Sequence, residues 1–435
     1  MKPTLKILIL LFSMMLIVLA GCNKEPEVDQ EYKKKMDDLN IPPGFIWRTA
    51  IDVPVTVTME YTGGIPPQYS KVSIYNADPV QTGALLSQGT AGYQFPFSTV
   101  LNLPTDLSTI FIKLTHSDGS EQVKQIQVAS AIQVTMTTSA VTQVYPDQDS
   151  DLVPDSFDEF PSDPTKAFRS YFPNSLESGS IMFEDNWPSK GDYDFNDLVM
   201  DYQTILFTNS QNLVVEIQSQ YHVRAAGAAL KNGFGFQLDN VSANLVTSVT
   251  GTSILNSFIT LSPNGTEYNQ PRAVIIVLDV IDNVVHKDPS SGDFFNTWPG
   301  VPKGTSDPVN VKFGLSIPQS ILDVGTPPFN PFLIKDKSRG YEIHMPGYIP
   351  TALVDSTLFG SADDNSIPAQ GIYYKSNIYL PWGLYTPSAY DYTYETVQIL
   401  DGYNYFDSWA QSNGALYRDW YRNVTGYRDE TKIYQ

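Results

Sequence analysis

The sequence predicts a mainly β protein, in which an N-terminal immunoglobulin-like β-sandwich precedes a larger β-sandwich or jelly-roll-like domain with a short C-terminal helix. Three observations support this fold class. Charged residues make up 17% of the chain, whereas Tyr (26) and Phe (22) are abundant and Pro (31) and Gly (28) recur throughout, which is typical of strands joined by turns. Several segments alternate apolar and polar residues with a period of two. The length of 435 residues allows two or three domains.

The N-terminal sandwich is expected over residues 45–138. Strand patterns occupy residues 53–58, 71–75 and 109–115. The dipeptide Asp118-Gly119 is a turn signal that we expect to close a hairpin. His116 stands just before this turn, where we expect a solvated side chain.

The larger domain is expected over residues 183–435. Strand patterns occupy residues 197–207, 212–223, 272–281 and 309–317. Aromatic residues at roughly helical spacing between Tyr403 and Tyr421 predict a terminal helix packed on the sandwich. The C-terminal third holds many more Tyr and Trp residues. Aromatic faces stack on sugar rings, yet packing inside a β-domain is the interpretation that we favour.

The first 21 residues have the order of a bacterial signal peptide. A basic start, Met1–Lys6, precedes the apolar run Ile7–Ala20. This run is too short for a permanent membrane-spanning helix. It ends in Leu-Ala-Gly-Cys22, which resembles a lipobox, where cleavage precedes a cysteine that then carries lipid. Because Cys22 is the only cysteine, we expect a lipid anchor on it and no disulfide.

Residues 22–44 are predicted to form a lipidated, solvated tether. Its acidic residues Glu25, Glu27 and Asp29 resemble the export signals of surface lipoproteins. We therefore expect an outer-membrane protein exposed at the cell surface. The formal net charge of -20 argues against nucleic acid, because phosphate binding needs clustered Lys and Arg. The same charge suits cations and neutral ligands such as glycans.

Residues 139–182 are predicted to link the two domains and carry the sharpest signal. With Asp147 as position 1, oxygen-bearing groups fall at the ligand offsets of an EF-hand-type calcium loop. The expected ligands are Asp147, Asp149, Asp151, the Val153 carbonyl, Asp155 and Asp158. Leu152 replaces the usual Gly at position 6, and several nearby Pro residues exclude long flanking helices. We predict a calcium loop outside an EF-hand; a disordered acidic linker is the alternative.

A second acidic cluster follows Gly191. In an extended chain, alternate polar side chains grip a cation while Tyr193 and Phe195 enter the core. Glu184 and Asp185 can join from a neighbouring segment. The expected ligands of this second calcium site are Asp192, Asp194, Asn196 and Asp197. A polar strand edge with a tight turn is the alternative.

The segment Phe183–Val199, FEDNWPSKGDYDFNDLV, resembles the signature of the LruC domain of bacterial lipoproteins and surface proteins. The Asp-rich repeat precedes it, and the likeness continues through Glu342–Gly347 and Phe406–Trp409. It spans about Asp147 to the C-terminus. The repeat is also similar to the thrombospondin type-3 calcium repeat, which uses a like spacing without paired helices. These resemblances imply calcium at the first cluster and carry no assigned biochemical activity.

The sequence lacks common catalytic motifs. The four His residues form no His-Glu-x-x-His pair, and there is no Gly-x-Ser-x-Gly elbow and no phosphate-binding Gly loop. We therefore expect a non-catalytic binding or adhesion module for a glycan or a protein. Two alternatives stay open. One is a polysaccharide hydrolase or lyase, since 47 acidic residues can supply a carboxylate pair; the other is a structural envelope component.

Overall fold

The computed structural model describes residues 34–63, 69–139 and 145–435. The predicted signal peptide and Cys22 lie outside these residues. The chain divides into two compact units, residues 1–35 and Met36–Gln435, and the fold below is that of the second unit. Within the described residues, no helix has the length and apolarity needed to cross a membrane.

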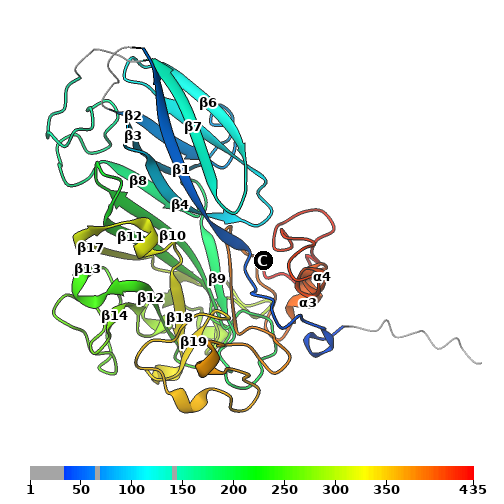
Figure 1. The fold of residues 1–435 in the computed structure, drawn as a ribbon. Coiled ribbons are helices and arrows are strands. Elements are labelled where there is room, and N and C mark those ends of the chain that lie inside the picture. Colours follow the sequence, from blue (N-terminus) through cyan, green and yellow to red (C-terminus); the bar gives the residue numbers. More distant parts are fainter. Residues whose placement is uncertain (1–33, 64–68, 140–144) are drawn as a thin grey trace, which may run out of the picture. The chain divides into compact units, whose positions relative to one another are not determined.

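The N-terminal strands form a sandwich of two sheets (Figure 1). They are β1 (Ala50–Thr62), β2 (Ser70–Tyr75), β3 (Leu85–Ala91), β4 (Phe97–Pro104), β5 (Thr109–Thr115), β6 (Glu121–Gln127) and β7 (Ile132–Ser139). One sheet has the order β4-β1-β7 and the other β3-β2-β5-β6. Val55 of β1 and Ile112 of β5 lie in one core, so the period-two pattern marks the inward face. The turn at Asp118-Gly119 closes the β5–β6 hairpin, which confirms that prediction.

A second, larger sandwich follows. Its strands are β8 (Phe168–Phe172), β9 (Gly179–Phe183), β10 (Leu198–Thr208), β11 (Val214–Ala225), β12 (Gly233–Ser242), β13 (Val246–Thr250), β14 (Arg272–Leu278), β15 (Val285–His286), β16 (Thr305–Ser306), β17 (Val309–Gln319), β18 (Asn330–Ile334), β19 (Glu342–His344) and β20 (Gly383–Thr386). One sheet has the order β13-β17-β11-β10-β9-β20, with β8 also paired to β10, and the facing sheet is β14-β12-β18-β19. Strands β15 and β16 belong to neither sheet and pair with each other. Ile217 of β11 and Phe236 of β12 share its core.

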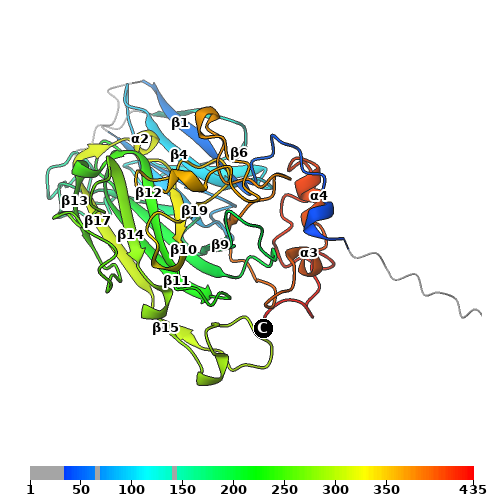
Figure 2. The ribbon, with the colours of Figure 1, turned by 90° about the horizontal axis from the view of Figure 1, so that it is seen from below.

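Helices are short. They are α2 (Ile321–Val324), α3 (Ile399–Gly402) and α4 (Phe406–Gln411). The predicted C-terminal helix is therefore present in α3 and α4, although it is shorter than the aromatic spacing suggests. Figure 2 shows the chain before β1 beside these helices. Phe45 and Trp47 pack on Trp409 with ring centroids 5.0 and 5.7 Å apart, and Met36, inside the predicted tether, is fully buried.

Two side-chain predictions have clear outcomes. His116 is not solvated: it is 4% exposed, because Ser70 of β2 and Gln122 of β6 contact its ring nitrogens from neighbouring strands. The favoured interpretation of the C-terminal aromatics is confirmed, since Tyr374, Trp382 and Tyr390 are fully buried. The domain boundaries proposed from the sequence stay predictions.

Candidate metal centres

The first acidic loop lies between β7 and β8 and is anchored by a small apolar cluster. Val153 is buried and packs with Phe157 and Phe168. The backbone carbonyl of Phe157 accepts a hydrogen bond from Lys71 Nζ of β2 at 3.0 Å. The loop therefore contacts both sandwiches. Its side chains are held by packing on two sides and not by the loop alone.

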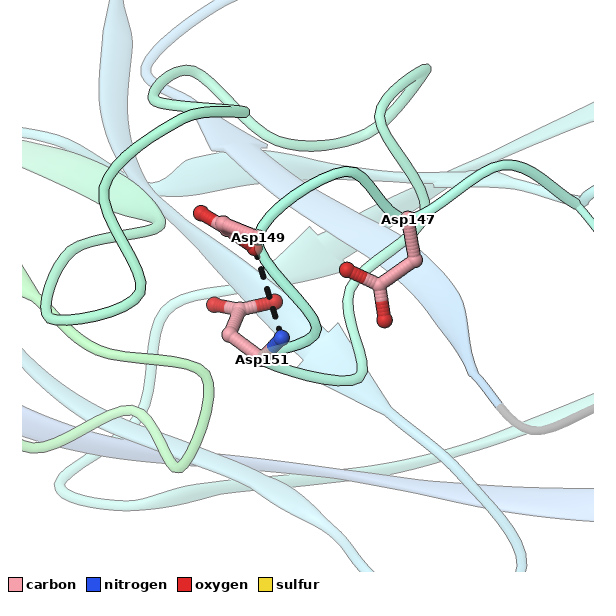
Figure 3. Close-up of side chains that lie close together, drawn as sticks. All are labelled: Asp147, Asp149 and Asp151. Carbon is pink, nitrogen blue, oxygen red and sulfur yellow. Dashed lines mark hydrogen bonds between the residues drawn. The ribbon is translucent and has the colours of Figure 1, made fainter.

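Three of the predicted ligands converge in this loop. Carboxylate oxygens of Asp147, Asp149 and Asp151 lie within 4.8 Å of one another, and Figure 3 shows the three side chains on one turn of the chain. Oxygens that bind one calcium ion at about 2.4 Å lie at most about 4.8 Å apart. The three carboxylates are thus close enough to share an ion. Asp155 and Asp158 are outside this group.

The backbone explains how Leu152 occupies a position where calcium loops usually have Gly. Its φ is 83°, which is the left-handed region that Gly adopts freely and a bulky residue rarely does. Its backbone N–H donates to Asp147 Oδ2 at 3.1 Å, and its side chain is 55% exposed. The departure from the calcium-loop pattern therefore lies in the residue and not in the shape of the turn.

Several carboxylate oxygens in this loop lack partners. The Oδ2 atoms of Asp149, Asp151 and Asp158 are buried and accept no hydrogen bond from the described residues. Burial, followed by repulsion from Asp149 and Asp147, raises the pKa of Asp151 to about 6. Burial and repulsion from Asp151 and neighbouring carboxylates raise the pKa of Asp158 to about 7. A cation with oxygen ligands would relieve both effects.

The second acidic cluster lies in the connection between β9 and β10. These strands pair antiparallel, with Phe183 opposite Leu198, so the connection begins and ends at the same sheet edge. Carboxylate oxygens of Glu184, Asp192 and Asp194 come within 4.8 Å of one another. Convergence here follows from chain reversal, which brings the end of one strand beside the start of the next.

The conformation of this connection differs from the extended chain that we expected. Tyr193 and Phe195 have φ values of 61° and 53°, so the chain coils instead of alternating along a strand. Their backbone N–H groups donate to Glu184 Oε2 and Oε1 at 3.1 and 2.7 Å. The turn thus wraps around the buried Glu184 carboxylate. Both rings still enter the core, as predicted.

The remaining predicted ligands, Asn196 and Asp197, lie at the margins of this cluster. Asn196 Oδ1 and Glu395 Oε2 are buried without hydrogen-bond partners among the described residues. A Cβ built on Gly227 would lie 2.0 and 2.5 Å from these two oxygens, so both face one small space. Asp197 Oδ2 accepts a hydrogen bond from the backbone N–H of Asp185 at 2.8 Å.

Glu395 was missed by the sequence reasoning. Its backbone N–H donates to the Thr297 carbonyl at 3.1 Å, and the next residue, Thr396, donates its N–H to Asp194 Oδ2 at 2.8 Å. These hydrogen bonds place Glu395 beside the β9–β10 connection, which lies some two hundred positions earlier in the sequence. No local pattern around Glu395 signals this contact.

The charges of the second cluster act on one another strongly. Burial, then repulsion from Asp192 and Glu395, raises the pKa of Asp194 to about 8. Burial, then repulsion from Asp192 and Asp185, raises that of Glu395 to about 7. Burial first, and then neighbouring carboxylates, hold the pKa of Glu184 far above its usual range.

Cations of the chain lie at one edge of this cluster. The charge of Lys335 partly offsets the increase that burial causes in the pKa of Asp185. Among the described residues, no Lys or Arg forms an ion pair with Glu184, Asp194 or Glu395. The potential metal ligands are all oxygen atoms, from carboxylates and one amide, and those without a hydrogen-bond partner are buried. This set fits a hard divalent cation, and calcium tolerates its irregular geometry better than magnesium.

In the comparisons with known proteins, a family match lies within the larger sandwich and a structural match covers most of the chain. Residues 212–421 match a domain of unknown function, DUF4842, which is slightly less than half of the chain. No curated protein matches. A solved chain described as a "putative lipoprotein" from Bacteroides ovatus aligns with a TM-score of 0.54 and 18% identity, over 84% of this chain and 98% of that chain. At this identity the likeness shows a shared fold alone.

Proposed function

We propose that this chain is a calcium-binding lipoprotein that acts as a non-catalytic binding or adhesion module, anchored through Cys22 to the outer membrane and exposed at the cell surface. The observation that carries the calcium part is the convergence of two groups of carboxylates, beside which the buried oxygens of Asp149, Asp151 and Glu395 have no partner among the described residues. The resemblances to the LruC domain and to the thrombospondin type-3 repeat support the same assignment.

The role of calcium is structural. At the first loop, an ion held by Asp149 and Asp151 would fix a segment that contacts β2 through Lys71 and packs beside β8. At the second loop, an ion beside Glu184 would tie the β9–β10 connection to the C-terminal chain through Glu395. In both places the cation offsets charge that the fold has already removed from water.

Thermal unfolding with and without calcium tests this assignment. The purified protein is melted in excess EDTA, in calcium and in magnesium. At a calcium concentration a hundredfold above the dissociation constant, one site adds roughly 2.7 kcal/mol to the free energy of unfolding. We expect an increase of several degrees in the midpoint that magnesium does not reproduce. An unchanged midpoint in millimolar calcium contradicts the assignment.

Two variants separate the sites, and one serves as a control. The double variant Asp149→Ala, Asp151→Ala should remove the contribution of the first loop, and Glu184→Gln that of the second. Asp163→Asn is the matched control, because Asp163 belongs to the same segment but accepts local hydrogen bonds from Thr165. The control should keep the full calcium response; if it loses as much as the double variant, the response does not come from the predicted ligands.

The lipid anchor has its own test, because Cys22 lies outside the described residues. Metabolic labelling with palmitate should mark the wild-type protein, and Cys22→Ser should abolish both the label and partition into the detergent phase. Protease treatment of intact cells then reports surface exposure. Labelling that persists in Cys22→Ser contradicts the anchor, and full protection of the labelled protein in intact cells contradicts the surface location.

A further inference from the structure

A polar cavity lies where the two sandwiches meet. Its volume is about 140 Å³, and its walls include Ala50 of β1, Asn102 of β4 and Gln237 of β12. A cavity of about 150 Å³ holds a six-membered ring such as benzene. The space between the two sandwiches therefore admits one ring-sized ligand.

One wall of this cavity presents hydrogen-bond acceptors without donors. Asn102 is 6% exposed; its Nδ2 donates to Asp52 Oδ1 at 2.8 Å, and its Oδ1 is buried with no partner among the described residues. Thr326 Oγ1 donates to the same Asp52 oxygen at 2.6 Å. Asp52 Oδ2 accepts no hydrogen bond from the described residues, so this wall favours a ligand that donates.

The other sheet contributes a second oriented carboxylate. Asp239 Oδ1 accepts hydrogen bonds from Gln237 Nε2 at 2.7 Å and from Asn330 Nδ2 at 2.9 Å. These contacts fix the side chain while its second oxygen accepts none from the described residues. Acceptors from two different sheets call for donors at several points around the ligand, and not at one end of it.

The cavity also holds one donor group and aromatic surface. The Arg48 guanidinium lies 5.5 Å from the centre of the Tyr348 ring and makes no ion pair or hydrogen bond with the described residues. Tyr385, which is 4% exposed, and Phe329 complete the aromatic part of the wall. One arginine and two aspartates give the lining a net negative charge, which disfavours anionic ligands.

We propose that this cavity binds one neutral, pyranose-sized sugar ring. Ring hydroxyls donate to the open carboxylate oxygens of Asp52 and Asp239, and they accept from Arg48. The C–H faces of the ring contact the tyrosines. The proposal deepens the binding role proposed above by naming the ligand class and the site, while its geometry uses none of the candidate calcium ligands.

Titration of the purified protein with glucose, galactose and mannose, each followed by calorimetry, tests this site. We expect saturable binding of at least one hexose with a dissociation constant of ~1 mM, and weaker binding of glucuronate. Arg48→Ala and Asp239→Asn should each weaken binding by tenfold or more. Lys124→Ala is the control, because Lys124 is exposed on β6, and it should leave binding unchanged.

Three other outcomes overturn the proposal. Alanine is titrated as a comparison ligand, and binding of alanine but of no hexose identifies a zwitterion site. Binding of neither ligand identifies a hydrated cavity. Hexose binding that survives both variants takes place at another site. If Arg48→Ala does not fold, Asp239→Asn alone decides. The titration is run in EDTA and again in calcium, so that hexose binding without any calcium response refutes the calcium assignment and leaves this site standing.

Discussion

The larger sandwich contains two clusters of buried carboxylates, which differ in how their negative charge is compensated. On the four-stranded sheet, Arg339 lies between Glu267 and Glu342 and forms ion pairs with both. His344 Nε2 approaches Glu342 Oε2 at 3.0 Å. In the β9–β10 connection, Glu184 and Asp194 are buried to a similar depth, but their carboxylates accept only backbone N–H groups and pair with no Lys or Arg among the described residues.

The pKa values record this difference. Burial raises the pKa of Glu342, but the hydrogen bond to His344 and the charge of Arg339 outweigh it and lower the pKa to about 2. Burial and repulsion raise the pKa of Asp194 to about 8. A cluster with its own cation is complete as the chain folds, whereas the acidic connection needs protons or an imported cation.

Removing the internal cation should have the largest effect. Arg339→Met leaves Glu267 and Glu342 buried without their guanidinium partner, and we expect unfolding in urea to show a loss of roughly 3–5 kcal/mol. Arg418→Met is the control, because Arg418 is exposed and donates to the Thr105 carbonyl; it should change stability by less than about 0.5 kcal/mol. Similar losses in both variants would remove the distinction.

The same neutralising substitution should act in opposite directions in the two clusters. Glu342→Gln weakens the pairing of Arg339 and should cost about 2 kcal/mol. Glu395→Gln relieves repulsion on Asp194 and changes a carboxylate whose Oε2 has no hydrogen-bond partner to lose, so the EDTA-treated protein should be as stable as wild type or more stable, while the response to calcium falls. The measurement is urea unfolding of both variants in EDTA and in calcium. A loss in EDTA from both variants contradicts the comparison.

The pH dependence of the calcium-free protein should follow the acidic loops. Folded-state pKa values of about 6 for Asp151, 7 for Asp158 and 8 for Asp194 exceed the ordinary value of 3.8. The folded state therefore holds protons that the unfolded chain has lost, and stability falls as pH rises through these values. Glu342 acts oppositely, since its contribution is lost only as pH falls from 4.5 towards 2.

Melting between pH 5 and 9 in EDTA checks this sign. The midpoint should decline from pH 6 to 8, and saturating calcium should abolish the decline, because the ion replaces the protons. A midpoint that rises over this range in EDTA is incompatible with the buried acidic clusters described above.

A smaller effect should come from the first loop. Leu152→Gly places in the left-handed turn the residue that adopts it freely, and since the leucine side chain is exposed, we expect a gain of about 1 kcal/mol and tighter calcium binding. Leu176→Gly is the matched control: Leu176 is also exposed but does not have a positive φ, and its replacement should be neutral or destabilising. If the two changes have equal effects on stability and on calcium affinity, the left-handed conformation of residue 152 does not control calcium binding.

Local patterns were sufficient to predict most strands. The alternation around Val55 and the apolar run after Arg272 reappear as β1 and β14 because strand side chains alternate in direction and buried strands are continuously apolar. The Asp-rich spacing likewise placed Asp147, Asp149 and Asp151 on one turn, since short-range spacing and loop geometry are linked.

Long-range contacts were beyond the same reasoning. Glu395 reaches Asp194 only because two segments far apart in sequence pack together, and the environment of Asn102 depends on a second sheet. The coiled turn at Tyr193 was also missed, because its conformation is set by hydrogen bonds to the buried Glu184 carboxylate and not by the intrinsic preference of Tyr.

The contact between the segment before β1 and α4 has a consequence for the order of folding. Met36 N–H donates to Gln398 Oε1 across 362 positions, and Trp47 packs on Trp409. At ribosomal rates of 5–20 residues per second, the partner of Met36 is made roughly 20–70 s later. This core is therefore assembled last although its first half is made first, and loss of either end leaves the other end's aromatic surface uncovered.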